Sequence, residues 1–412
     1  MLRLFLWEQK VNGRRLVIVG HGMVAQRLLE ELTAREHPYG LIRVFNGETV
    51  LAYNRILLSS VLAGEASEDS VQLKPEAWFQ ARDIVCHRGD PVAAIDTEQR
   101  RVTTESGFQA DYDDLVFATG SSPAALGVDG EQLPGVMGFR DLQDTRTLID
   151  ISQRCRRAVV IGGGFLGLEA AEGLRARGMA VTVLHRSAHL LNRQLDPVAG
   201  NLLANALSAR GVTVQTGASP QAILGSQRAR AVQLTDDTLI STDLVVVAAG
   251  ITPRIALAEA SGLACKRGIL VDQGLASSVA GIYAVGECCQ LGEETFGLVE
   301  PGYRQAAVLA DRLCGGHSLF QPDTVATRLK ISGIPIYSCG ATCADEHTDS
   351  VVWQDHEADR YCHLLIKNNR LTGAVLFGET QDGPWYEEQI RRGDDISQRR
   401  HTLAFGAAYA TG

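Results

Sequence analysis

Residues 158–187 read AVVIGGGFLGLEAAEGLRARGMAVTVLHRS, and this stretch decides the fold expected for the chain. A β-branched run enters the glycine-rich turn, a helix-forming stretch leaves it, and a second strand follows at 181–184. Only glycine lets the main chain approach a pyrophosphate closely at a helix N-terminus. The segment therefore predicts a βαβ unit that binds a dinucleotide, with Gly162, Gly164 and Gly167 as its phosphate-binding glycines.

The end of the second strand departs from the usual pattern. A site for NAD normally has an acid there, about 20 residues beyond the glycines, that accepts hydrogen bonds from the adenosine ribose. Here the strand ends in His185, Arg186 and Ser187. Arg186 can bind phosphate oxygens bidentately and Ser187 can add a hydroxyl donor, so the site is expected to accept NADPH. The alternative is that Arg186 is only solvated and that selectivity is poor.

A second βαβ unit lies near the N-terminus. Strands are expected at 16–19 and 41–45, with a helix at 26–33 between them. In the turn, Gly20 and Gly22 take the glycine positions, Ala25 takes the small-residue position, and His21 is expected beside the phosphates or facing solvent. After the second strand, Asn46 and Glu48 are both candidates for the ribose contact, and a plain turn is an equally good interpretation.

These two units, with further apolar strands at 114–117 and 244–247, predict an α/β protein with two Rossmann-like domains. The first domain is expected to be discontinuous, at 14–146 and 252–322, with the second inserted at 147–251. Short strands and a helix at 384–392 then predict a small α+β domain at 323–395, followed by a tail at 396–412.

Composition narrows the class of protein. The chain has 412 residues, 45% of them hydrophobic, and its net charge of -9 is spread out, which argues against a general nucleic-acid binder. The apolar N-terminal patch is too short to span a membrane and lacks a cleavage site, so we expect a cytoplasmic protein. Nine cysteines at irregular spacing predict neither a disulfide framework nor a metal site. Adjacent Cys288 and Cys289 are expected to be packing residues, and Cys339 with Cys343 do not complete an iron–sulfur set.

Several separate motifs carry a family resemblance. The stretches AYNRILLS (52–59), YDDLVFATGSSP (112–123), GITPR (250–254) and GIYAVGEC (281–288) resemble the flavoprotein reductases with two dinucleotide domains, the glutathione-reductase-like group that contains rubredoxin and ferredoxin reductases. The stretches at 296–313 and 327–340 resemble, more narrowly, the flavin half of the assimilatory nitrite reductase large subunit and the reductase subunit of bacterial assimilatory nitrate reductase. The likeness runs from about residue 15 to 380.

The resemblance implies FAD on the first unit and NADH or NADPH on the second. Its nearest members commonly use NADH, which leaves NADPH, NADH and dual use all open for a chain that lacks the acid. By family position, further cofactor-binding residues are Arg55, Ser59, Thr119, Gly120, Gly250, Gly286 and Glu287, and Glu169 is a candidate for positioning the nicotinamide or a purely structural residue.

The function expected from this resemblance is hydride transfer from NAD(P)H to FAD, with the electrons then passed to a separate redox protein. No side chain is required as an acid or base in the hydride step. The acceptor implied is the catalytic subunit of assimilatory nitrate reductase, and the small third domain is the expected docking or homodimer surface. The alternatives are a rubredoxin or ferredoxin reductase and a flavin-containing redox sensor.

Overall fold

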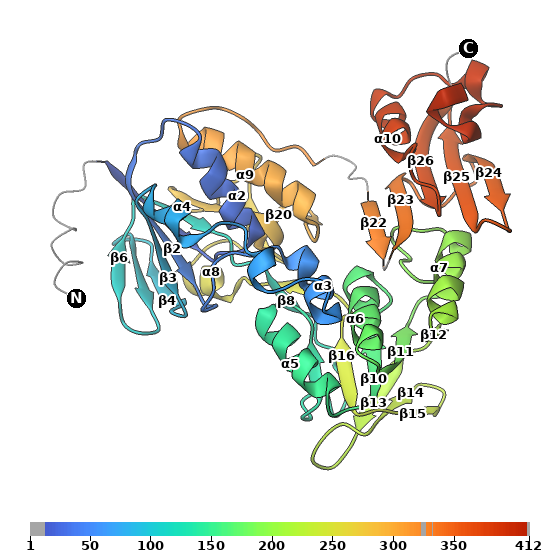
Figure 1. Cartoon of the computed structure of the whole chain (residues 1–412). Helices are drawn as coiled ribbons and strands as arrows, with labels where there is room; N and C mark the ends of the chain where they lie inside the picture. The colour runs from blue at the N-terminus through green and yellow to red at the C-terminus, as the bar shows by residue number, and fades with distance from the viewer. Residues whose placement is uncertain (1–12, 323–326, 332, 410–412) are drawn as a thin grey trace. The chain divides into compact units, whose positions relative to one another are not determined.

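The computed structural model describes residues 13–322, 327–331 and 333–409 (Figure 1). They form two compact units. Among the described residues, the first unit draws on 13–58, Ala66–Ser122 and Ile251–Pro322, and the second on Ser59–Glu65, Pro123–Gly250, 327–331 and 333–409. The prediction made for the N-terminal patch falls on residues 1–12, which lie outside the described residues.

The first unit is built on a five-stranded parallel sheet in the order β19-β7-β1-β2-β3. Its strands are β1 (Arg14–Val19), β2 (Tyr39–Asn46), β3 (Ile84–Arg88), β7 (Asp114–Phe117) and β19 (Ile282–Ala284). Helices α2 (Met23–Thr33) and α9 (Val299–Leu313) pack against each other, with α4 (Glu76–Gln80) and α8 (Ala256–Ala260) as shorter helices (Figure 1). Apolar residues on β1 are at most 5% exposed, as expected for a strand with both faces covered.

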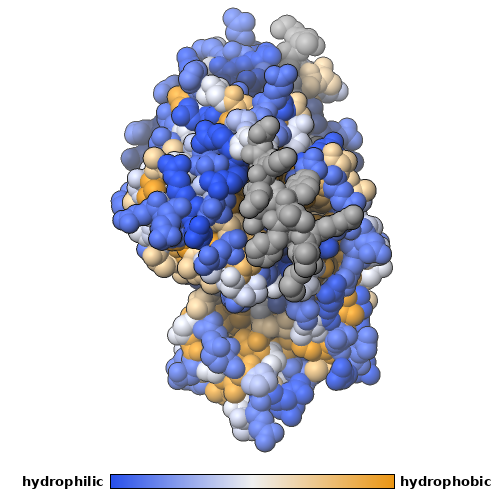
Figure 2. Space-filling model, turned by 90° about the vertical axis from the view of Figure 1, so that its left-hand side faces the viewer, coloured by the Kyte–Doolittle hydropathy of each residue, from blue (hydrophilic) through white to orange (hydrophobic). Residues whose placement is uncertain are grey.

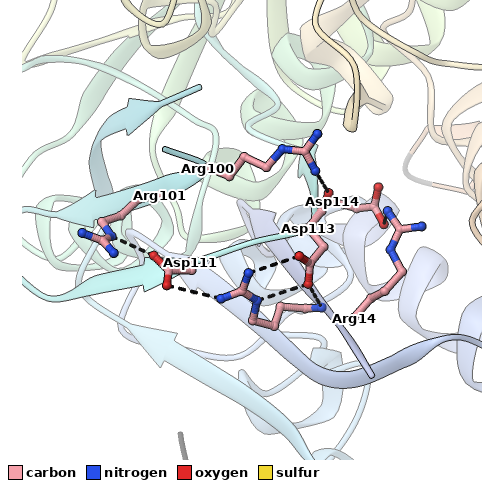
Figure 3. Close-up of polar contacts among 7 residues, drawn as sticks. Arg14, Arg100, Arg101, Asp111, Asp113 and Asp114 are labelled. Carbon is pink, nitrogen blue, oxygen red and sulfur yellow. Dashed lines mark hydrogen bonds and ion pairs between the residues drawn. The ribbon is translucent and has the colours of Figure 1, made fainter. Parts of the chain in front are cut away.

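Smaller sheets complete this unit. They are β4 (Val92–Asp96), β5 (Arg101–Thr104) and β6 (Gln109–Asp111); β18 (Ile269–Val271), β20 (Cys289–Leu291) and β21 (Glu294–Thr295); and the pair β8 (Ser121–Pro123) with β17 (Ile251–Pro253). A polar network ties the start of β1 to β6 and to the residues that open β7 (Figure 3). In it Arg15 pairs with Asp113 and Asp111 at 3.1 and 3.2 Å, and Arg101 pairs with Asp111 at 2.7 Å. These groups are about a third exposed, so each pair contributes little stability.

The second unit contains another five-stranded parallel sheet, ordered β12-β11-β10-β16-β9. Its strands are β9 (Val136–Gly138), β10 (Arg157–Ile161), β11 (Ala180–His185), β12 (Val212–Thr216) and β16 (Leu244–Val247). The helices of this unit are α3 (Leu58–Ala63), α5 (Leu142–Ser152), α6 (Phe165–Ala176) and α7 (Pro197–Ala209). A small antiparallel sheet consists of β13 (Pro220–Leu224), β14 (Ala231–Leu234) and β15 (Leu239–Ser241). Residues 123–146 were expected with the first dinucleotide domain. They fall in this unit because β9 pairs with β16.

The C-terminal part of the second unit is an antiparallel sheet in the order β22-β23-β26-β25-β24. It contains β22 (Thr327–Ile331), β23 (Ile334–Gly340), β24 (Asp349–Asp355), β25 (Arg360–Lys367) and β26 (Arg370–Phe377), with α10 (Gly383–Arg392) packed against it. Asn368 and Asn369 form the turn between β25 and β26, both with positive φ, as a two-residue hairpin turn requires. Beyond α10, Ile396 and Leu403 are buried in the core of this part.

Hydrophilic residues cover most of the face shown in Figure 2, and hydrophobic residues gather on it in smaller areas. Among the helices of the described ranges, none is both long enough and apolar enough to cross a bilayer.

Candidate functional site: two dinucleotide-binding loops

The first glycine loop joins β1 to α2. Gly20 has a φ of +101°, and a Cβ built on it would overlap the carbonyl oxygen of Ala118, so this position requires glycine. Gly22 has no atom within 4 Å of the place where its Cβ would lie. The loop is therefore closed behind Gly20 and open at Gly22, which leaves space for a ligand at the helix N-terminus.

The second glycine loop, between β10 and α6, repeats this arrangement. Gly162 has a φ of +128°, its Cβ would overlap the carbonyl oxygen of Ala248, and Gly164 again has nothing within 4 Å. Gly167 lies on the first turn of α6, where a Cβ would overlap the carbonyl oxygen of Gly162. The first unit has Ala25, which is 0% exposed, at the corresponding place. Both loops thus keep the small residue that lets helix and strand pack closely.

The helices that follow these loops start without a side-chain cap. Gly22 and Gly164 are the N-cap residues of α2 and α6, neither supplies a capping oxygen, and neither helix has an acidic residue in its first turn. By contrast, α5 and α7 are capped by Asp141 and Asp196, whose side chains accept backbone N–H bonds. The free N–H groups and the positive end of the helix dipole at α2 and α6 suit an anionic phosphate.

His21 lies in the interior, so of the two predicted alternatives the solvent-facing one is wrong, and a place beside the phosphates stays a prediction. It is 4% exposed and packs edge-on against Phe79, with ring centroids 5.5 Å apart. Its Nε2 lies 3.3 Å from the side-chain amide oxygen Oε1 of Gln26, so Nε2 carries the proton. Burial lowers the pKa of His21 to about 4, because desolvation disfavours the imidazolium form. A neutral imidazole therefore supports the first loop from within.

The end of β2 uses its polar side chains within the protein. Asn46 is 7% exposed and donates its amide N–H to the carbonyl oxygen of Val50 at 3.0 Å. Glu48 accepts a hydrogen bond from the Tyr53 hydroxyl at 2.7 Å and forms an ion pair with Arg55. Glu48 and Arg55 are thus brought together after β2. The ribose contact of Asn46 or Glu48 stays a prediction, and so does the contact of Arg55 with the cofactor.

Residues that follow β7 and β19 also meet in the first unit. The carboxylate of Glu287 accepts a hydrogen bond from Ser121 at 2.9 Å, and its Oε2 lies beside Gly120, 3.6 Å from the place of a Cβ. The Thr119 hydroxyl donates to the carbonyl oxygen of Arg254 at 2.9 Å. The structure therefore places Thr119, Gly120 and Glu287 together, and their role towards a flavin stays a prediction.

Gly286 was expected from the resemblance, but its support was not. It has a φ of +81°, and its N–H donates to Gln305 Oε1 at 2.7 Å. Gln305 is 0% exposed on α9. The signal that could have identified this contact is a glutamine on the otherwise apolar, buried face of the amphipathic helix α9.

His185 is bound to the second glycine loop. Its Nδ1 accepts the N–H of Gly163 at 3.1 Å, and its Nε2 lies 3.1 Å from Oδ1 of Asn192, so Nε2–H is the donor. Burial, which is only partly offset by the Asn192 contact, lowers the pKa of His185. The ring is therefore neutral and structural. Sequence reasoning missed Gly163 and Asn192, since neither is marked by its local pattern.

Arg186, the next residue, is exposed, and no described residue forms an ion pair or hydrogen bond with its side chain. Gly250, the other predicted contact residue of this unit, has a φ of +139°, and its carbonyl oxygen accepts the N–H of Ala124 at 2.9 Å. Arg186 is thus available to an anionic ligand, whereas the backbone of Gly250 is bonded to the residue that follows β8.

Glu169 lies on α6 and is hydrogen-bonded to the hydroxyl of Ser59 on α3. Burial raises the pKa of Glu169 to about 7, because the carboxylate form is poorly solvated, and the Ser59 contact acts in the opposite direction. At neutral pH the group is therefore divided between its acid and carboxylate forms. A carboxyl group of this kind can donate or accept a hydrogen bond.

All nine cysteines are free. Cys288 and Cys289 are 0% exposed, and burial raises the pKa of both thiols, so they are protonated packing residues. Across the described ranges, no group of three or more His, Cys, Asp or Glu residues is placed to hold a metal ion.

Two glycine loops with uncapped helices, each at the carboxyl edge of its own parallel sheet, define a protein class with two dinucleotide sites. The chain belongs to the pyridine nucleotide-disulphide oxidoreductase family, whose model matches residues 14–308. A second model, the rubredoxin NAD+ reductase C-terminal domain, matches residues 326–394. These matches confirm the expected fold class and family, and with them an oxidoreductase that uses FAD and NAD(P)H.

Individual relatives refine this assignment. The chain is 39% identical over 389 residues to the assimilatory nitrate reductase electron transfer subunit of Bacillus subtilis, covering 94% of this chain and 50% of the relative. It is 30% identical to rubredoxin-NAD(+) reductase of Ectopseudomonas oleovorans, covering 73% and 80%. Among solved structures, a ferredoxin reductase from Rhodopseudomonas palustris superposes with a TM-score of 0.83 at 26% identity, covering 95% of this chain and 100% of that one. The chain spans about half the length of the nitrate and nitrite reductase relatives it matches.

The residues present fit the two cofactors of the family. Gly22 and Gly164 leave open space at uncapped helix N-termini, where a pyrophosphate would lie against backbone N–H groups. When bound, FAD supplies the chemistry of accepting a hydride and releasing electrons, and the protein supplies orientation and electrostatics.

Proposed function

We propose that this chain is the FAD-dependent NAD(P)H reductase of an assimilatory nitrate-reducing system and delivers electrons to a separate redox protein, with the nitrate reductase catalytic subunit as the acceptor. We assign FAD to the first unit and the nicotinamide dinucleotide to the second. The observation that carries this proposal is the pair of open, uncapped glycine loops, one in each compact unit. The likeness to the Bacillus subtilis electron transfer subunit supports the acceptor.

The nicotinamide site is proposed to accept both NADH and NADPH. No acid follows β11, and His185 is neutral, so repulsion of a 2′-phosphate is absent at this strand end. Arg186 offers an exposed guanidinium for such a phosphate. A ribose without the phosphate loses only this contact, so both dinucleotides remain substrates.

A second candidate function is rubredoxin or ferredoxin reduction. It is favoured by the match of residues 326–394 to the rubredoxin reductase C-terminal domain and by the likeness to the Ectopseudomonas oleovorans enzyme. The two candidates share the hydride step and differ only in the protein that takes the electrons.

The test follows the flavin absorbance of the FAD-loaded protein under anaerobic conditions after mixing with NADH, and separately with NADPH. Rapid bleaching by both is expected. Reoxidation is then measured with the nitrate reductase catalytic subunit and nitrate, with rubredoxin, and with ferredoxin. Fast reoxidation by a carrier alone would favour the second candidate. Bleaching without turnover to any carrier would indicate a redox sensor, and no bleaching would refute the hydride-transfer proposal.

A further inference from the structure

The segment that follows β11 is attached to the second glycine loop at several atoms. Gly163 donates its N–H to Nδ1 of His185 and its carbonyl oxygen accepts the N–H of Leu191 at 2.9 Å, while Oδ1 of Asn192 accepts Nε2–H of the imidazole. Leu191 has a φ of +49°, a conformation that an apolar L-residue adopts only when its surroundings fix it. A shift of residues 186–195 would therefore move the residues around the proposed nicotinamide-nucleotide loop.

The same segment ends in a buried carboxylate. Asp196 is 3% exposed and caps α7, where its Oδ1 accepts the N–H of Ala199 at 2.9 Å. Its Oδ2 accepts two further bonds from β25 of the C-terminal sheet, from the Tyr361 hydroxyl at 3.0 Å and from Nδ1–H of His363 at 2.8 Å. Two of the three donors to this carboxylate thus belong to the C-terminal part of the unit.

The His363 contact matters energetically because the carboxylate is buried. Burial by itself would raise the pKa of Asp196, but the bond from His363 and the N–H of Ala199 lower it below its usual value. Removing one donor from a buried carboxylate costs the desolvation penalty of the unpaired oxygen, which is larger than the net value of an ordinary hydrogen bond. Without His363, the end of the segment loses one of its two hydrogen bonds from β25.

Resting on the proposed function, we infer that His363 is a positioning residue for the nicotinamide dinucleotide. Through Asp196 it fixes residues 186–195 against Gly163, so that the C-terminal part sets the affinity of the second loop for NAD(P)H. The residue does not touch the dinucleotide. It acts on the geometry of His185 and on the placement of Arg186.

The order Ser350, His363, Asp196 is also the hydrogen-bond order of a serine-hydrolase triad, with Ser350 Oγ 3.1 Å from Nε2 of His363. Ser350, however, lies within β24 and pairs with Leu365 in the sheet ladder. A triad serine sits on a sharp turn beside N–H groups that stabilise an oxyanion. The position of Ser350 therefore favours a positioning role for the network over acyl transfer.

The test compares three variants of the FAD-loaded protein. His363→Ala removes the donor to Asp196, and His363→Asn keeps an N–H near the place of Nδ1. His347→Ala is the matched control, because His347 is an exposed histidine of the same part and its ring lies 3.9 Å from the carboxylate of Glu346, away from Asp196. The readouts are the dissociation constants of NAD+ and NADP+ by calorimetry, the split between KM and kcat, and hydrogen exchange of the Gly163 and Leu191 amides.

For His363→Ala, a rise of about tenfold in the dissociation constant and in KM is expected, with kcat within about twofold and flavin content unchanged. Exchange at the two amides should accelerate. His363→Asn should restore most of the affinity, and His347→Ala should match the wild type. If His363→Ala does not fold, Tyr361→Phe removes the other donor and should give a smaller change in the same direction.

Unchanged dissociation constants and unchanged amide exchange in His363→Ala would overturn this inference. A wild-type protein that binds neither dinucleotide would instead refute the proposed function. The two failures are therefore distinguishable.

Discussion

The two glycine loops of this chain share a backbone design, but the histidine that supports each loop comes from a different place in the chain. In each loop the first glycine has a positive φ and the N-cap glycine is open. In the first loop the middle residue is His21, whose own buried ring packs inward against Phe79. In the second the middle residue is Gly163, and the imidazole comes from His185 at the end of the next strand.

This difference explains the residue found at each middle position. A Cβ on Gly163 would lie 2.6 Å from Leu190 Cδ2 and 2.8 Å from Cγ of His185, so the incoming side chains require glycine there. His185 takes the strand-end place that an acid takes in many NAD sites, and uses it to hold the loop. The lesson is that a missing ribose ligand can reflect a structural substitution as well as a change in dinucleotide preference.

The largest effect is expected from filling the open N-cap positions. Gly22→Val and Gly164→Val should both fold, because their side chains enter empty space, but each would occupy the place of a phosphate. Gly22→Val should weaken FAD binding at least about a thousandfold, and Gly164→Val should do the same for NAD(P)H. Flavin content per protein and calorimetric titration with NADP+ measure the two effects.

Each of these variants is the control for the other. Gly164→Val should retain its flavin, and the assignment of FAD to the first loop would be wrong if it emerged flavin-free while Gly22→Val did not.

The next effect is a pH dependence of stability that differs between the units. His21 has a folded pKa of about 4, below its usual 6.5, so well above pH 6.5 the ring is neutral in both the folded and the unfolded state. As the pH falls from 6.5 to 4, the unfolded chain binds a proton that the fold does not. Stability should then decrease by about 3 kcal/mol relative to His21→Asn. Urea unfolding across this range measures the difference.

Glu169 in the second unit should give the opposite slope. Its folded pKa of about 7 lies above the usual 4.5, so its contribution is intact below pH 4.5 and is lost as the pH rises through 7. Glu169→Gln should remove this loss. If the free energy of unfolding of His21→Asn and of Glu169→Gln changed with pH at the same slope, the contrast between the two units would be contradicted.

A smaller effect is expected from crowding the second loop. Gly163→Ala should lower the free energy of unfolding by about 2 kcal/mol, since the new methyl group meets Leu190 and His185. Combining it with His185→Ala should cost less than the sum of the two changes, by about 1 kcal/mol. In the first loop, where the side chain is native, His21→Ala should show no such coupling with Gly163→Ala. Strict additivity of the Gly163 and His185 changes in chemical unfolding would disprove the mutual packing.

The smallest effect concerns dinucleotide choice. Arg186→Asp should weaken NADPH about tenfold and leave NADH unchanged or tighter, because it replaces a phosphate ligand with a ribose acceptor. Arg230→Asp, the same charge change at another exposed position of the second unit, is the control. The ratio of kcat/KM for the two dinucleotides measures the effect, and an unchanged ratio would show that Arg186 is only solvated.

Much of the site could be predicted because its determinants are local. The spacing of glycines after an apolar strand predicts two turns, and in the structure each of these glycines lies at its expected turn: Gly20, Gly22, Gly162 and Gly164. The burial of His21 was not predictable, since it depends on Phe79, which arrives from a distant helix.

The sequence by itself determined the class of protein: two βαβ units in order, their glycine positions, and a C-terminal domain of short strands. These features follow from the periodicity of apolar residues and from the positions of glycine, because the backbone freedom of glycine affects only the local conformation of the chain. Tertiary structure alone decided what His185 does, that residues 123–146 join the second unit, and that Asp196 is held by His363, a contact across 167 positions. Such partners are fixed by packing between elements far apart in the chain, and no local pattern records them.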